Sequence, residues 1–66
     1  MIPPLDIFKS EKDGSVIWKG SAENMEVARL SVKMLMVTSP GSYIIHSQIT
    51  GHKMLVKPDG STERVA

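Results

Sequence analysis

The sequence contains no cysteine, which excludes disulfide bonds, a thiolate metal site and a cysteine nucleophile. It also lacks a run of 18 apolar residues, so no membrane-spanning helix is expected. The first residues have neither the basic start nor the apolar stretch of a signal peptide. Since the absence of cysteine suits a reducing compartment, we expect a cytoplasmic protein with no membrane partner.

Charge of one sign is not in excess, because eight Lys and Arg stand against seven Asp and Glu, for a net charge of +1. Most proteins that bind nucleic acids unaided carry a larger basic excess, since phosphate neutralisation supplies much of their affinity. Nucleic acid is therefore not the first choice of partner. With 66 residues, of which 41% are hydrophobic, the chain (residues 1–66) forms one small folded domain. A ligand cavity of about 300 Å³ would take much of its core, which disfavours an enzyme.

The pattern of apolar residues and turn signals predicts an α+β domain with the order hairpin, helix, hairpin (ββαββ). One helix should pack on one face of an antiparallel sheet of four or five strands. The predicted elements are strands at 5–10 and 15–19, a helix at 22–37, and strands at 43–48 and 53–57. Residues 62–66 either form a fifth strand or fray.

Turn and cap residues mark the ends of these elements. Asp13 and Gly14 predict a tight turn, because this pair accepts positive φ angles at little cost. Ser21 is a suitable N-cap for the helix, since its hydroxyl accepts a hydrogen bond from an unpaired backbone N–H. Pro40 and Gly41 should end the helix, because proline cannot continue it and glycine adopts the left-handed cap.

Strand side chains alternate between faces, so parity divides them into two classes. The class expected beneath the helix is nearly all apolar and holds the three aromatic residues: Phe8, Val16, Trp18, Tyr43, Ile45, Met54 and Val56. The class expected on the open face mixes aliphatic residues with lysines: Ile7, Lys9, Ile17, Lys19, Ile44, His46, Lys53, Leu55 and Lys57.

The helix carries apolar residues on two flanks. One stripe, expected to face the sheet, consists of Met25, Ala28, Val32, Leu35 and Met36. The second stripe has coiled-coil spacing and consists of Val27, Leu30, Met34 and Val37. Because one sheet covers only one stripe, we expect a homodimer in which the second stripe is the interface. The reverse assignment of the two stripes remains an alternative.

Residues with chemical potential are few. His46 and His52 have no cluster of carboxylates that would complete a metal site, and no serine lies in a nucleophile motif. We therefore expect no catalytic residue, no metal and no cofactor. The open face would present four lysines to a partner: Lys9, Lys19, Lys53 and Lys57. Sheets that bind RNA stack bases on aromatic side chains of the open face. The predicted parity puts no aromatic side chain on the open face of this sheet.

Two segments carry a resemblance, namely Trp18 to Ser21 before the helix and Pro40 to Ile44 after it. With the helix between them they resemble short bacterial proteins of unknown function that have a hairpin–helix–hairpin plan. The resemblance implies this fold and no activity. The sequence thus favours a small non-catalytic homodimer that acts as a protein-interaction or accessory module. The alternative is a weak nucleic-acid binder that uses the lysine-bearing face.

Overall fold

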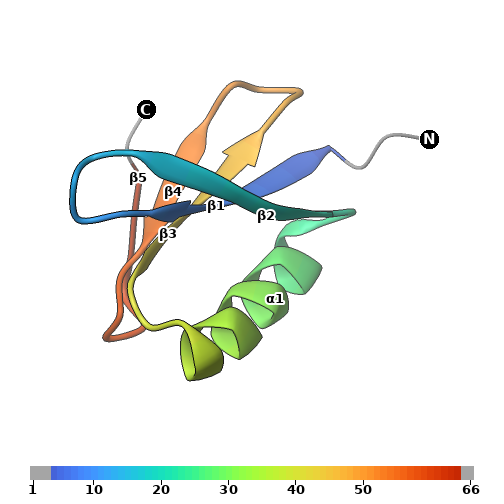
Figure 1. The fold of residues 1–66 in the computed structure, drawn as a ribbon. Helices are drawn as coiled ribbons and strands as arrows, with labels where there is room; N and C mark the ends of the chain where they lie inside the picture. Colours follow the sequence, from blue (N-terminus) through green and yellow to red (C-terminus); the bar gives the residue numbers. More distant parts are fainter. Residues whose placement is uncertain (1–3, 65–66) are drawn as a thin grey trace.

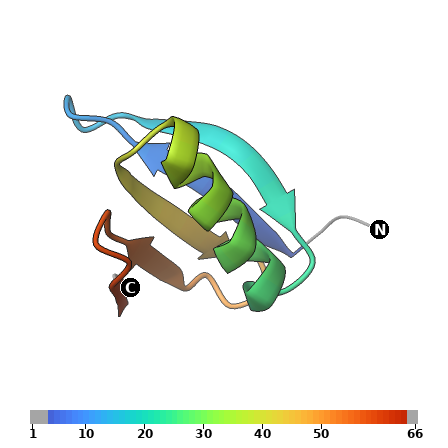
Figure 2. The same ribbon diagram turned by 90° about the horizontal axis from the view of Figure 1, so that it is seen from below.

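Within the described residues, five strands form one antiparallel sheet, and one helix lies across one of its faces (Figure 1). The computed structural model describes residues 4–64. Its elements are β1 (Leu5–Ser10), β2 (Val16–Ala22), α1 (Met25–Thr38), β3 (Ser42–Ser47), β4 (Lys53–Val56) and β5 (Thr62–Arg64). Across the sheet the strands follow the order β2-β1-β3-β4-β5. Seen from the side of the sheet that carries the helix, β4 and β5 lie beyond α1 at one edge of the sheet (Figure 2).

The α+β class with one helix on an antiparallel sheet is confirmed. Along the chain the order of elements is ββαβββ instead of ββαββ. The described residues include a fifth strand. Its three residues pair with β4, with Thr62 opposite Val56 and Arg64 opposite Met54. The rest of the segment predicted at 62–66 lies outside the described residues.

The helix begins later than predicted. Ser21 and Ala22 belong to β2, where they pair with Asp6 and Leu5 of β1, so Ser21 is not the N-cap. Asn24 caps the helix instead, because its side-chain oxygen accepts the N–H of Val27 at 2.9 Å. Ser21 and Ala22 extend the first hairpin, and do not start the helix, because each of them forms a further pair with β1.

A bulge interrupts the pairing of β1 with β2. Ile7 pairs with Gly20, whereas the next residue, Phe8, pairs with Trp18, so Lys19 is an extra residue on β2. On its other side β1 runs in continuous register with β3, where Ile7 lies opposite Ile45. This alignment places Ile7 beneath the helix.

The predicted faces are therefore wrong for the first hairpin. Ile7 is buried, and Phe8, Val16 and Trp18 lie on the opposite face, so the aromatic residues do not cluster in the core. Both parities of this hairpin are rich in apolar residues, and hydropathy alone did not distinguish them. For the second hairpin the prediction is confirmed. The buried core consists of Leu5, Ile7, Ala22, Ala28, Val32, Tyr43, Ile45 and Val56, and Met54 packs against it.

The predicted orientation of the helix is confirmed. Ala28 and Val32 are fully buried against the sheet, and Met25, Leu35 and Met36 pack against the same core. The far end of the helix is anchored by Tyr43, whose buried ring lies on β3 and whose hydroxyl donates to the carbonyl of Ser39 at 2.6 Å. This bond ties the C-terminal end of α1 to the middle of the sheet.

Two turns share one construction. In the first, Ser15 donates its N–H (2.9 Å) and its hydroxyl (2.6 Å) to Oδ1 of Asp13. In the second, Ser61 donates to Oδ1 of Asp59 at 2.8 Å and 2.7 Å. The serine hydroxyl, followed by the serine N–H, lowers the pKa of each carboxyl below its ordinary value of 3.8, because both donors favour the charged form.

We predict a matching pH dependence. Since the folded pKa values are depressed, the turn hydrogen bonds contribute fully above the ordinary pKa and are lost as the pH falls through the folded values. Carboxyl-carbon NMR titration should place both aspartates below 3.8. Ser15→Ala should raise the pKa of Asp13 toward that value and leave Asp59 unchanged as an internal control. A titration of Asp13 that Ser15→Ala does not alter would contradict this account.

Candidate interaction surfaces

The outer flank of α1 forms the first apolar surface, which we call the helix stripe. It consists of Val27, Leu30, Met34 and Val37, which are 42%, 58%, 73% and 81% exposed. These are the residues that the sequence assigns to a partner interface. They lie one helical turn apart along the helix, so they form one continuous strip on the side away from the sheet.

The face of the sheet opposite the helix forms the second apolar surface, which we call the open sheet face. Phe8 and Trp18 pair across β1 and β2 there, and Phe8 also lies opposite Ile44 of β3. Trp18 is 59% exposed. A shallow hollow of about 310 Å³ runs over this face and is lined by Phe8, Val16, Ile44, His46 and Lys53. Sequence reasoning missed this aromatic pair because it assigned the wrong parity to the first hairpin.

A small polar network borders the open sheet face. The indole N–H of Trp18 lies 3.4 Å from Oδ1 of Asp6, toward which it points as a donor. The side-chain amide of Gln48 donates to the other carboxylate oxygen of Asp6 at 2.7 Å. Asp6 therefore holds the edge of the indole and the loop after β3 in place, which orients the exposed ring.

The four lysines do not share one face, so the predicted basic face is wrong. Lys9 alternates to the helix side with Ile7; its stem lies over Gly41, and its ammonium is 3.8 Å from Glu11. Lys19 is the bulged residue of β2. Lys57 forms a 2.9 Å ion pair with Glu63, whose hydrogen bond and charge raise the pKa of the lysine. Lys53, opposite His46, is the lysine that lines the hollow on the open sheet face.

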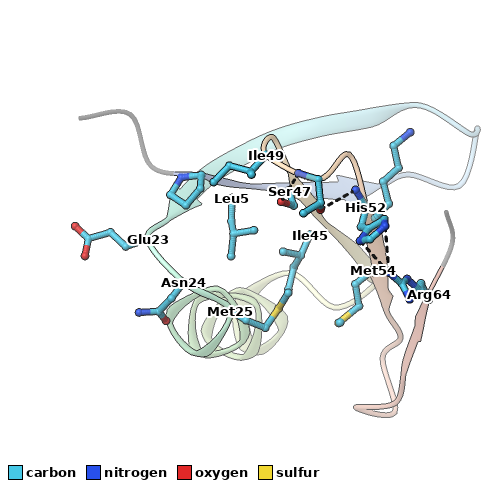
Figure 3. A pocket seen from close by; sticks show the side chains of 13 residues that line it. Leu5, Glu23, Asn24, Met25, Ile45, Ser47, Ile49, His52, Met54 and Arg64 are labelled. Carbon is cyan, nitrogen blue, oxygen red and sulfur yellow. Dashed lines mark hydrogen bonds between the residues drawn. The ribbon is translucent and has the colours of Figure 1, made fainter.

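A third feature is a hollow of about 530 Å³ beside the N-terminal end of α1 (Figure 3), which we call the end hollow. Its inner surface is apolar and includes Leu5, Met25, Ile45 and Met54. The loop between β3 and β4 borders it, held by a hydrogen bond from the N–H of Ser47 to the carbonyl of His52 at 2.9 Å. The sequence contains no motif that predicts this hollow, because its walls come from four separate segments.

Arg64 and His52 meet at one side of the end hollow. Nη2 of Arg64 lies 2.8 Å from Nδ1 and 3.1 Å from Nε2 of His52. Since a guanidinium has no acceptor, one nitrogen of the imidazole, the one without a hydrogen, accepts in this contact. Within residues 4–64, Arg64 has no carboxylate at ion-pair distance. The sequence places His52 in a turn and does not predict this contact with Arg64.

Within the described part of the chain, no three side chains of His, Asp or Glu gather into a metal-binding group. Among residues 4–64, no helix combines the length and the apolar character needed to cross a bilayer.

Comparison of the chain with protein-family models, with curated proteins and with solved structures finds no match. The fold agrees with the hairpin–helix–hairpin plan of the expected resemblance, extended by β5.

The corrected face of the first hairpin leads to a prediction about stability. Trp18→Ala should lower the free energy of unfolding by about 1 kcal/mol or less, because an exposed side chain loses little burial. Ile7→Ala, at a position that is 1% exposed, should cost about 2–5 kcal/mol. Urea unfolding followed by circular dichroism measures both. Equal losses for the two variants would place Trp18 in the core and contradict the register.

Proposed function

We propose that the protein is a non-catalytic interaction module that works as a homodimer through the helix stripe. The observation that carries the proposal is the exposure of Leu30, Met34 and Val37, each more than half exposed on one strip of α1. Soluble monomers seldom leave a contiguous apolar strip in water. Burying such a strip against a second copy removes it without requiring any other partner.

The spacing of the stripe suits a two-fold axis. Its intervals are three, four and three residues, which read the same in both directions. An antiparallel pairing therefore sets Val27 against Val37 of the second copy, and Leu30 against Met34 of the second copy. Such a self-complementary patch is what an isologous dimer interface requires.

The size of the helix sets the expected affinity. A helix of 14 residues is about 21 Å long, so a single helix pair buries less than the roughly 1,600 Å² of a standard interface. We therefore expect self-association in the micromolar range. The two open sheet faces would then point away from the interface and remain accessible to a protein partner.

Assembly through the sheet edges is less favourable. β2 is an edge strand whose pairing pattern is broken by the bulge at Lys19. The other edge strand, β5, carries Glu63 and Arg64 among its described residues. Bulges and charged side chains both hinder the addition of further strands.

The proposal predicts the effect of one charge. Leu30→Glu should shift the protein from dimer to monomer at tens of micromolar, because the dimer would bury an unpaired carboxylate. Ile49→Glu is the matched control, since Ile49 is 80% exposed and lies in the loop after β3, outside the helix stripe. It should leave the dimer intact. Sedimentation velocity gives the mass, and circular dichroism verifies that both variants fold.

Two results would contradict the dimer proposal. One is a wild-type protein that stays monomeric at tens of micromolar. The other is a Leu30→Glu variant that remains dimeric, which would move the interface to the open sheet face or elsewhere.

A second candidate function is weak binding of single-stranded nucleic acid on the open sheet face. The specific observation in its favour is the Phe8–Trp18 pair, with Lys53 and His46 nearby. Exposed aromatic rings on a sheet are platforms for stacking bases. Against it, Asp6 borders the same surface and the chain carries a net charge of only +1.

This candidate predicts quenching of Trp18 fluorescence by a short oligothymidylate at low salt. Phe8→Ala should weaken binding by about 1–3 kcal/mol, the usual range for one stacked base. Lys9→Gln is the control, because Lys9 lies on the helix side and its loss should change binding little. Affinity should fall as salt rises. Absence of binding at low salt, or equal effects of the two variants, would exclude this function.

A further inference from the structure

We infer that the end hollow is a binding site for a small amphipathic carboxylate, that is, an aliphatic chain with a carboxylate at one end. The observation behind this inference is a single concavity that joins an apolar interior to a cationic side. Neither half alone would specify the ligand. The end hollow is separate from the proposed dimer interface, because it includes no residue of the helix stripe.

The apolar half suits a hydrocarbon chain. Leu5 and Ile45 form its inner wall and are 7% and 1% exposed. Met25 and Met54 flank them (Figure 3) and are only partly buried. Unbranched thioether side chains adapt their shape to different ligands. A volume of about 530 Å³ falls within the usual range for small-molecule sites.

The cationic half suits a carboxylate. Arg64 lines the end hollow, and His52 contacts its guanidinium at 2.8 Å. No carboxylate of residues 4–64 lies at ion-pair distance from Arg64. A planar guanidinium donates two parallel hydrogen bonds to a carboxylate. The imidazole contact holds the guanidinium at this side of the hollow.

Glu23 and Asn24, on the other side of the hollow, do not compete for this role. Glu23 lines the opposite side, and its carboxylate points away from the interior (Figure 3). Asn24 already uses its side-chain oxygen to cap the helix, where it accepts the N–H of Val27. The ligand's charged end is therefore expected beside Arg64, with its chain running toward Leu5 and Met25.

The test uses the full chain labelled with nitrogen-15 and three probes. Octanoate carries both chain and charge, 1-octanol carries the chain, and acetate carries the charge. Octanoate should cause saturable shifts of the backbone amides of Leu5, Met25, Ile45 and Met54. Octanol should bind about tenfold more weakly, because one charge-assisted interaction is lost, and acetate should not saturate.

The variants identify the anchor. Arg64→Gln should weaken octanoate binding about tenfold, to the level of octanol, and Arg64→Lys should give an intermediate affinity because the charge remains without the planar fork. Arg29→Gln, an exposed substitution on α1 outside the hollow, is the matched control and should change nothing.

Three results would overturn the inference. The first is the absence of saturable shifts around the end hollow, including a case in which octanoate shifts only the open sheet face or the helix stripe. The second is equal affinity for octanoate and octanol. The third is unchanged octanoate affinity in both Arg64 variants. None of these results depends on the oligomeric state, so they leave the dimer proposal to its own test.

Discussion

In residues 4–64, one helix covers part of one face of a five-stranded sheet, and the other features of the molecule follow from this incomplete cover. Ala28 and Val32 enter the core beneath α1, where they meet Ile7, Tyr43 and Ile45. The buried core contains eight hydrophobic side chains within the described residues, which is little for a chain that must offset its conformational entropy. Two further apolar surfaces, the helix stripe and the open sheet face, have no element of residues 4–64 to cover them.

The width of the sheet also explains the end hollow. The strands β4 and β5 extend beyond α1 (Figure 2), so the helix leaves Met54 only partly buried. The hollow occupies the corner between the start of the helix and these strands. The last described strand, β5, contributes Arg64 to one side of this hollow, beside its apolar inner surface. The proposed binding site thus lies where the helix is too narrow to cover the sheet.

Sequence reasoning predicted the elements well and the faces of the first hairpin poorly. The helix flanks were predictable because Ala28 and Val32 differ from Leu30 and Met34 by helical phase. In β1 and β2, apolar residues occupy both parities, and the bulge at Lys19 changes the parity within β2 itself. No pattern in the sequence predicts that bulge. The end hollow was equally beyond prediction, because Leu5, Ile45, His52 and Arg64 come together only through the strand order.

The central claim is that the helix stripe is covered by a second copy of the chain. Isotope-filtered NMR on a mixture of labelled and unlabelled protein tests this most directly, because it detects methyl contacts between copies alone. The account predicts contacts between Leu30 and Met34 of different copies, and between Val27 and Val37 of different copies. Intermolecular contacts confined to Phe8, Val16 or Ile44 on the open sheet face would contradict it, as would a spectrum with no contacts between copies.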